Sequence, residues 1–249
     1  MLTQERQELI LQKLQEEKTI KISEIVEITN SSESTIRRDL TQLEKESKLR
    51  RIHGGATLID SKIEELSFNE KMVFNKEQKI KIAKYAASLI KDGDCIYLDA
   101  GTTTFEMIQY INSKNIVIVT NGLKHIDAIV EKDIEAYIIG GFVKNSTKAV
   151  IGINALKDLK NYRFDKVFLG MNGIDLKNGF TTPDSNEAYL KKLAMDLGLE
   201  TYVLADKSKF NRTTFVKVAD LYEATIILDE EVFNMDKYLN ETNIKVVIK

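Results

Sequence analysis

The feature that most constrains the fold is an alternation of short apolar segments with helix-like segments between residues 76 and 249. Seven segments of four or five residues predict strands, with helical periodicity between most of them. The predicted strands are Cys95–Leu98, Ile116–Val119, Ala136–Ile139, Lys166–Leu169, Thr201–Leu204, Thr225–Leu228 and Ile244–Ile248, and the predicted helices include Thr104–Ile111, Leu123–Glu131 and Asn186–Leu197. Because such alternation forms parallel sheets covered on both faces, residues 76–249 predict a doubly wound α/β domain.

The first sixty residues follow a different pattern, that of three short helices and a hairpin. Apolar residues at helical spacing predict helices at Leu2–Lys18, Ile22–Ile28 and Glu33–Lys45. Ser32 is expected to cap the third helix, and His53–Gly55 to form the turn of the hairpin. The pattern predicts a winged helix-turn-helix domain at residues 1–60 and a connector at 61–75. Asn75 is expected to cap the helix that opens the second domain.

Charge is balanced in the N-terminal domain as a whole but is concentrated locally. Residues 1–58 contain ten basic and ten acidic residues, whereas residues 37–51 contain six basic and three acidic ones, a net charge of +3. Because duplex DNA presents dense phosphate charge, such a patch is suited to bind it. The alternative is that the Arg-Arg-Asp stretch at 37–39 forms local ion pairs on a solvated helix face.

Helix-turn-helix geometry indicates which side chains would contact DNA. The second helix of the pair lies in the major groove, with its N-terminal residues against base edges, while the wing is expected at phosphates or the minor groove. The expected contacts are Ser32, Glu33, Ser34, Thr35, Arg37 and Arg38 on the helix and Arg50, Arg51 and His53 on the wing. One of Arg37 and Arg38 is expected at a phosphate and the other nearer the bases, and the sequence does not say which.

A polar turn follows the first predicted strand of the second domain. Residues 99–104, Asp-Ala-Gly-Thr-Thr-Thr, open a helix, where backbone N–H groups and three hydroxyls can surround a phosphate. The turn is not a P-loop, because no lysine follows in register, nor a dinucleotide fingerprint, because the glycines are missing. The alternative is a threonine-rich helix cap. Further polar turns follow later strands, and parallel strands end at one edge of a sheet.

Two motifs resemble a known family. Residues 35–40, Thr-Ile-Arg-Arg-Asp-Leu, and residues 51–56, Arg-Ile-His-Gly-Gly-Ala, look like those of the DeoR family of bacterial transcriptional regulators. Ser31 departs mildly from the family, since many members carry valine there. The resemblance implies double-stranded operator DNA as a partner. It also implies a sensor domain that is similar in fold to ribose-5-phosphate isomerase and binds a phosphorylated sugar.

The resemblance further implies the residues of the effector site. They are Asp99, Gly101, Thr102, Thr103, Thr104, Asn121, Gly141, Asn172, Glu187, Lys191, Asp206 and Lys209, with phosphate at 101–104. Surface solvation is the alternative for the two lysines, and a salt bridge along its own helix for Glu187. Residues 93–104 and 179–184 are similar to the fructose-operon repressors of Gram-positive bacteria, which implies a repressor released by fructose 1-phosphate. Tagatose 6-phosphate, from the related lactose and tagatose repressors, is the alternative inducer.

The sequence argues against several other functional classes. The segment Leu169–Gly173 lacks the acidic cluster of the isomerase relatives, which predicts a binding domain and not an enzyme. One cysteine and two histidines leave little for zinc, and no cofactor or metal is expected. No apolar run approaches the ~18 residues of a membrane span, and the lone Cys95 fits a cytoplasmic protein. Reading two half-sites about 34–36 Å apart requires a homo-oligomer, a dimer or a tetramer.

Overall fold

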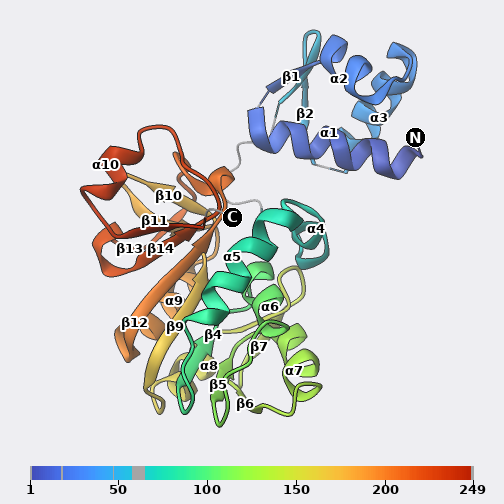
Figure 1. Ribbon diagram of the computed structural model, residues 1–249. Coiled ribbons are helices and arrows are strands. Elements are labelled where there is room, and N and C mark those ends of the chain that lie inside the picture. The colour runs from blue at the N-terminus through green and yellow to red at the C-terminus, as the bar shows by residue number, and fades with distance from the viewer. Residues whose placement is uncertain (1, 18, 47, 58–64, 248–249) are drawn as a thin grey trace. The chain divides into compact units, whose positions relative to one another are not determined.

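The computed structural model describes residues 2–17, 19–46, 48–57 and 65–247. Contacts divide the chain into an N-terminal unit, Met1–Ser61, and a C-terminal unit, Lys62–Lys249 (Figure 1). Each unit folds around apolar side chains of its own. Within the described ranges, no helix combines the length and the apolar character needed to cross a membrane.

The N-terminal unit consists of three helices and a three-stranded antiparallel sheet of order β1-β3-β2. Its elements are α1 (Thr3–Glu17), β1 (Thr19–Lys21), α2 (Ile22–Thr29), α3 (Glu33–Lys45), β2 (Arg50–Ile52) and β3 (Gly55–Thr57). The predicted winged helix-turn-helix is confirmed, and Ile36, Leu40 and Leu43 form the fully buried face of α3. Strand β1 was not predicted, because three residues between two helices are too few to show alternation.

Local chemistry explains where these elements begin and end. Helix α2 ends before Asn30, whose φ of 49° is the left-handed conformation that asparagine tolerates. The predicted cap of α3 is confirmed, since Ser32 Oγ accepts a hydrogen bond from the N–H group of Thr35 at 3.3 Å. In the wing, Gly54 has a φ of 78°, and a Cβ at Gly55 would lie 2.2 Å from the carbonyl oxygen of Ile20. The turn therefore requires glycine at both positions.

The C-terminal unit is built on a seven-stranded sheet in which all neighbouring strands are parallel. The strands are β4 (Cys95–Leu98), β5 (Val117–Thr120), β6 (Glu135–Ile138), β9 (Phe164–Gly170), β12 (Gly198–Ala205), β14 (Thr225–Leu228) and β15 (Ile244–Val246), in the order β15-β14-β12-β9-β4-β5-β6. They correspond to the seven predicted strands, and β9 and β12 are longer at both ends than predicted.

Helices cover both faces of this sheet, with α5 in front of the strands in Figure 1. One layer is α5 (Lys76–Ser88), α6 (Thr102–Ile108) and α7 (Leu123–Val130), and the other is α8 (Ile153–Leu159) and α9 (Ser185–Leu197). Strand β4 shows the division, because Ile96 and Leu98 pack with the first layer and Tyr97 with the second. The central strands β4, β5, β9 and β14 are largely buried and read as apolar runs, which is why they were predictable. The predicted doubly wound architecture is confirmed.

Two small antiparallel additions were not predicted. Strands β10 (Gly173–Asp175), β11 (Gly179–Thr182) and β13 (Val216–Ala219) form a sheet of order β10-β11-β13 beyond the carboxyl ends of β9 and β12 (Figure 1). Strands β7 (Phe142–Lys144) and β8 (Ala149–Ile151) form a hairpin. The remaining elements are η1 (Lys207–Lys209), η2 (Leu221–Glu223) and α10 (Met235–Leu239). Most of these short strands mix apolar residues with glycine or polar residues, so they show neither an apolar run nor enough alternation to be separated from loops.

Residues 65–75, expected as a connector, fold onto the C-terminal unit. Helix α4 (Phe68–Val73) begins with a capping box in which Ser67 and Glu70 bond reciprocally. The buried ring of Phe68 meets that of Phe105 edge-on, with the centroids 5.7 Å apart. Asn75 does not cap α5, and that prediction was wrong. Its φ is 51°, and its side-chain amide donates to Ser208 at 3.5 Å.

Candidate nucleic-acid interface and candidate effector site

The first turn of α3 presents a polar surface. Ser32, Glu33 and Ser34 are exposed, and Ser32 Oγ lies 3.0 Å from the hydroxyl of Ser34 and 2.9 Å from that of Thr35. These hydroxyls can exchange their mutual bonds for bonds to base edges or phosphate oxygens. The structure therefore brings four of the expected DNA contacts to one turn.

The two arginines of α3 differ in their surroundings. Arg37 donates from Nε and Nη2 to Oε1 of Glu33, one helical turn earlier, at 2.9 and 2.6 Å. Arg38 is exposed, and in the described part of the chain its guanidinium forms no ion pair or hydrogen bond. One arginine is thus already paired with a carboxylate, and the other is free for an anionic partner.

We expect Arg38→Ala to weaken operator binding more than Arg37→Ala. An arginine contact to guanine is worth about 1–3 kcal/mol, or about 5- to 150-fold in affinity, and Arg37 must first give up Glu33. Glu33→Gln is expected to strengthen binding, because it frees Arg37 and removes a negative charge from the turn. Fluorescence anisotropy with operator DNA at one salt concentration measures all three variants. A larger loss for Arg37→Ala contradicts the assignment.

The wing carries the other expected contacts. Arg51 donates from Nη1 to Thr41 Oγ1 and from its backbone N–H to Glu44, both at 2.8 Å. These bonds hold β2 against α3. His53 is exposed in the turn of the wing, and Arg50 lies on β2 with a side chain outside the described part of the structure. Arg51 therefore fixes the wing as well as presenting a positive charge there.

A buried ion pair underlies this surface and was not predicted. Arg6 on α1 donates from Nε to Asp39 Oδ2 at 2.5 Å and from Nη2 to Oδ1 at 3.3 Å. The two side chains are only 9% and 5% exposed. Asp39 directly follows Arg38, so the pair cross-links α1 to the helix that carries the candidate DNA contacts. The alternative of local ion pairing at 37–39 holds for Arg37 but not for Asp39.

The second candidate site lies where the strand order of the large sheet changes direction. Strands β4 and β9 are neighbours, but the chain proceeds from β4 through β5 to β6 on one side and from β9 to β12 on the other. The connections that follow two such strands diverge and leave a crevice, where open α/β sheets bind their ligands. Asp99 follows β4 and Gly170 ends β9, so the expected effector residues begin at this edge.

Asp99 joins the elements at this edge. Its side chain is 2% exposed and accepts hydrogen bonds from the N–H groups of Gly101 (3.0 Å) and Gly170 (2.9 Å), from the Thr104 hydroxyl (3.0 Å) and from Lys191. A Cβ at Gly101 would lie 2.8 Å from Asp99 Oδ1, so the close turn requires glycine. Because its bonds are internal, Asp99 shapes the turn and positions Lys191.

The three threonines of the turn are not equivalent. Thr104 is fully buried, with its hydroxyl 2.8 Å from the Asp99 carbonyl oxygen and 3.2 Å from His125 Nε2. Thr102 and Thr103 remain 7% and 9% exposed, and their hydroxyls form no hydrogen bond with any described residue. Thr104 therefore holds the turn, whereas Thr102 and Thr103 have hydroxyls available to a ligand.

Helix α9 contributes charges from the other face of the sheet. Burial opposes the charge of Lys191, but Asp99 and Glu187 outweigh it and raise its pKa above the ordinary value. Glu187 accepts hydrogen bonds from Lys144 at 3.0 Å and from Thr147 at 2.9 Å. Surface solvation does not hold for Lys191, which is buried, whereas Lys209 is partly exposed. The hydrogen-bond partners of Glu187 come from the β7–β8 hairpin and not from its own helix. Sequence reasoning missed Lys144, which lies on the short strand β7.

Asn172 connects this group to a further carboxylate that was not predicted. Its amide donates to Glu65 at 3.0 Å, and its Oδ1 accepts from Thr182 at 3.0 Å. Glu65 also pairs with Lys71 and with Lys144. Glu65 and Lys71 belong to the segment expected as a connector, where isolated charged residues carry no signal of burial.

A second group of charges surrounds Asp206, which follows β12. Asp206 is buried and accepts a hydrogen bond from the N–H group of Ser208 at 2.9 Å. Burial, followed by the charge of Lys209, lowers the pKa of Lys79 to about 7. Burial and the like charge of Lys71 also lower the pKa of Lys209, although Asp206 opposes them. Lysines held close together in this way favour an anionic ligand.

Two buried polar side chains near the threonine turn retain unpaired atoms. Asn121 donates to the carbonyl oxygen of Val150 at 3.2 Å, but its Oδ1 has no partner among the described residues. His125 Nε2 lies 3.2 Å from the Thr104 hydroxyl, and its Nδ1 has no hydrogen-bond partner among the described residues. Unpaired buried acceptors are rare because they cost free energy. Asn121 Oδ1 is therefore a place where a ligand hydroxyl would be favourable.

We expect the C-terminal unit to lose about 3 kcal/mol of stability through His125 between pH 6.5 and pH 4. Burial lowers the pKa of His125 to about 4, whereas an unfolded histidine titrates near 6.5. Between these values the unfolded chain binds a proton that the folded chain does not, so stability falls as the pH falls. His125→Gln should remove this contribution to the dependence of unfolding free energy on pH, which urea unfolding followed by near-UV circular dichroism measures. If the unfolding free energies of the wild type and of His125→Gln fall equally between pH 6.5 and pH 4, the prediction is contradicted.

Gly141, another expected effector residue, follows β6 and, within the described part of the chain, forms no hydrogen bond with the charged side chains above. It is exposed, and a Cβ at this position would lie 2.6 Å from the carbonyl oxygen of Ile151 and 3.1 Å from the Ala155 side chain. Glycine is required there by the close packing of the β7–β8 hairpin. The role of Gly141 as an effector contact stays a prediction.

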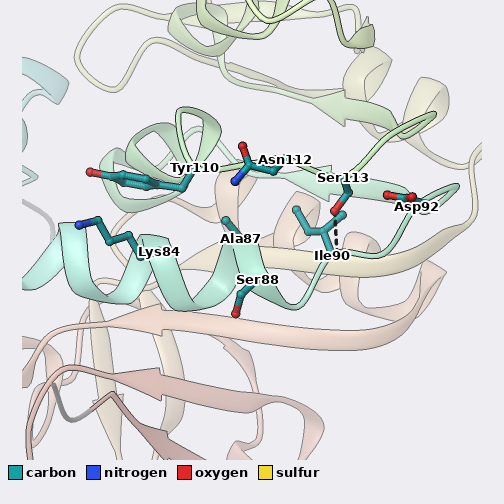
Figure 2. Close-up of a pocket in the computed structure, with 8 residues that line it drawn as sticks. All are labelled: Lys84, Ala87, Ser88, Ile90, Asp92, Tyr110, Asn112 and Ser113. Carbon is teal, nitrogen blue, oxygen red and sulfur yellow. Dashed lines mark hydrogen bonds between the residues drawn. The ribbon is translucent and has the colours of Figure 1, made fainter.

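A pocket of about 440 Å³ lies at the opposite edge of the sheet, and Figure 2 shows the residues that line it. Lys84 and Tyr110 line one end, and Asp92 and Ser113 line the other. Asp92 precedes β4 and Ser113 precedes β5, so the pocket lies at the amino ends of these strands and is not part of the effector cluster. In the described ranges, no three His, Cys, Asp or Glu side chains are grouped so that they could hold a metal ion.

Comparison with known proteins identifies the family. Residues 74–230 match the DeoR C terminal sensor domain, and residues 6–62 match the DeoR-like helix-turn-helix domain. The chain belongs to the DeoR family. This DeoR-family protein is therefore a DNA-binding transcriptional regulator that joins a helix-turn-helix domain to a sensor domain, and the resemblance carried by residues 35–40 and 51–56 is confirmed.

The DeoR-family regulator is similar to other regulators along its length. It is 49% identical to an uncharacterized HTH-type transcriptional regulator, FruR, of Bacillus subtilis, with 99% of each chain covered. It is 36% identical to a lactose phosphotransferase system repressor of Staphylococcus epidermidis, with 85% of this chain and 86% of the relative covered. A solved ribose 5-phosphate isomerase from Methanocaldococcus jannaschii is a distant likeness, with 19% identity, 55% of each chain covered and a TM-score of 0.41.

Proposed function

We propose that this regulator represses a sugar-utilisation operon and is released from its operator by a phosphorylated sugar, fructose 1-phosphate. The observation that carries the proposal is the buried cluster of lysines and carboxylates around Asp99 and Asp206, at the switch point of the sheet. This cluster lies in the sensor domain of a chain whose other domain is a helix-turn-helix. Ligand binding and DNA binding are thus carried by one molecule.

A sugar phosphate matches the cluster chemically. The lowered pKa values of Lys79 and Lys209 mean that an anion would stabilise both charges. The unpaired hydroxyls of Thr102 and Thr103 can donate to phosphate oxygens. Sugar hydroxyls both donate and accept, which suits the unpaired Oδ1 of Asn121. An apolar ligand would leave these groups without partners, at a cost of about 1–3 kcal/mol each.

The choice of sugar is supported by similarity to relatives. Residues 93–104 and 179–184 resemble fructose-operon repressors, and the 49% identical relative FruR extends the likeness to the full chain. These similarities support fructose 1-phosphate as the inducer. The 36% identity to a lactose phosphotransferase system repressor supports tagatose 6-phosphate as the second candidate.

A homo-oligomer is part of the proposal. One copy of α3 contacts one half-site, and two half-sites about 34–36 Å apart on double-stranded operator DNA require two copies. The phosphosugar would favour an arrangement of the two copies in which the spacing of their α3 helices does not match the half-sites. Its effect is limited by its difference in affinity for the two arrangements.

A second candidate function, an isomerase-like enzyme, has one observation in its favour. Asp229 follows β14, and burial together with Asp206 raises its pKa to about 6, in the range of a general base. The other carboxylates are engaged, since Asp99 and Glu187 accept several hydrogen bonds each. We therefore propose a non-catalytic sensor, and an isomerase assay with the purified protein accompanies the test.

Fluorescence anisotropy on DNA from the regulator's own upstream region tests the proposal. Fructose 1-phosphate, tagatose 6-phosphate and fructose 6-phosphate are titrated at one salt concentration, because affinity for DNA depends on salt. Release by fructose 1-phosphate alone supports the regulator, the inducer and the sign of the response. Release by tagatose 6-phosphate alone replaces the inducer. Tight DNA binding that none of the sugars alters overturns the sensor assignment.

A further inference from the structure

The segment that precedes α4 places a carboxylate within the proposed effector site. Glu65 is only 6% exposed and is bound by Lys71, by Lys144 at 2.9 Å and by Asn172 at 3.0 Å. Asn172 is itself an expected sugar contact, and Lys144 also binds Glu187, another expected contact. Glu65 thus occupies the amide of Asn172, a donor that the effector would need, together with two neighbouring ammonium groups.

Electrostatics hold this carboxylate in its charged form. Burial opposes the charge of Glu65, but Lys71 and Lys144 outweigh it and lower its pKa to about 2. Its charge also favours the protonated forms of Lys191 and Lys209. Carboxylates and phosphates are both oxyanions that accept from ammonium and amide donors. Two anions cannot share these donors without strong repulsion, so Glu65 and a phosphate would compete.

Because of the position of Glu65 in the chain, its displacement would affect the segment that precedes α4. It lies near the start of the C-terminal unit, which begins at Lys62, so it is among the first residues after the N-terminal unit. The segment has a second anchor, since Phe68 donates from its N–H group to the Ser146 carbonyl oxygen at 2.8 Å and packs on Phe105. Loss of the Glu65 contacts would therefore detach the beginning of the segment and leave α4 held at Phe68.

We propose that Glu65 is an internal competitor of the effector. In the unliganded regulator its carboxylate occupies the donors of the effector site, and the phosphorylated sugar displaces it. Displacement frees the chain at Glu65, ahead of α4, and so couples the effector site to the segment that leads to the DNA-binding domain. The inference rests on the proposed function, because it takes the effector to be a sugar phosphate.

The first measurement is the affinity of the full-length protein for fructose 1-phosphate by isothermal titration calorimetry. We expect Glu65→Gln to bind about tenfold or more tightly than the wild type, because a site occupied by its own carboxylate about nine-tenths of the time loses that factor in apparent affinity. Glu131→Gln is the control, since it removes an equal charge at an exposed position at the end of α7. Its affinity should equal that of the wild type.

The second measurement is amide hydrogen exchange of residues 65–73 with and without fructose 1-phosphate. We expect the ligand to speed exchange at the beginning of this segment in the wild type, and Glu65→Gln to exchange at the faster rate without ligand. The wild-type comparison needs no variant, so it decides the question even if Glu65→Gln folds poorly. Exchange that the ligand slows or leaves unchanged overturns the proposal, even where Glu65→Gln binds more tightly, because loss of a negative charge alone explains that gain.

The outcomes separate this proposal from the proposed function. If the wild type binds fructose 1-phosphate and Glu65→Gln binds equally or more weakly, Glu65 is a structural partner or a ligand contact, and the competitor proposal is overturned alone. If neither protein binds any of the three sugar phosphates, the proposed function and the competitor proposal are both overturned.

Discussion

Asp39→Ala is expected to destabilise the N-terminal unit by about 3–5 kcal/mol, the usual cost of removing one partner of a buried ion pair. The Asp39 carboxylate receives two hydrogen bonds from Arg6, and both side chains are almost fully buried. Without the carboxylate, the guanidinium charge loses its main compensation inside the unit. The free energy of unfolding of a small domain is about 5–15 kcal/mol, and a domain of this size lies near the lower end of that range. Asp39→Ala would therefore remove most of the stability of the N-terminal unit.

The measurement must report on this unit alone. The first 61 residues contain no Phe, Tyr or Trp, so near-UV circular dichroism follows only the C-terminal unit, and hydrogen exchange of α3 peptides follows the N-terminal one. Glu33→Ala is the matched control, because it removes a carboxylate from an exposed pair on the same helix, worth about 0–1 kcal/mol. A loss below about 1 kcal/mol for Asp39→Ala shows that the pair contributes no more than a surface one.

Asp39 also shows where sequence reasoning reaches its limit. Spacing along α3 correctly predicts Ile36, Leu40 and Leu43 as the buried face, since burial recurs at helical period. The same spacing cannot show that Asp39 is buried, because its partner Arg6 lies 33 residues away on another helix. A charged residue beside two arginines has the same local pattern whether it is solvated or buried.

In the C-terminal unit too, features with a local sequence pattern were predictable, and features that depend on tertiary packing were not. The central strands β4, β5, β9 and β14 are largely buried and appear as apolar runs, so they were predictable. The edge strands β6 and β15 are more exposed but keep apolar residues, and they were predicted as well. The turns that follow them, at Asp99 and Asp206, were predictable because parallel strands end at one edge. Lys79 and Lys144 lie on α5 and β7, where one lysine among others gives no signal. Their part in the cluster follows from tertiary packing alone.

Thr103→Glu is expected to abolish the response to the phosphosugar while leaving operator affinity unchanged. Thr103 lies in the first turn of α6, is 9% exposed and has a hydroxyl without a partner among the described residues. A carboxylate about 4 Å from the phosphate would repel it by about 4 kcal/mol for each unit charge, which corresponds to a loss of about 100-fold or more in effector affinity. A glutamate at the start of a helix is favoured by the helix dipole, so α6 is expected to form.

Thr103→Val distinguishes the effect of an added negative charge from the effect of losing the hydroxyl. It keeps the shape of threonine and removes one hydrogen bond to a charged group, worth about 1.5–3 kcal/mol, so it should weaken the response without abolishing it. Anisotropy on operator DNA with increasing fructose 1-phosphate measures the wild type and both variants. A full response from Thr103→Glu places the phosphate away from this turn, at the lysines around Asp206. Loss of operator binding in the same variant shows instead that the sensor domain supports DNA binding before any ligand arrives.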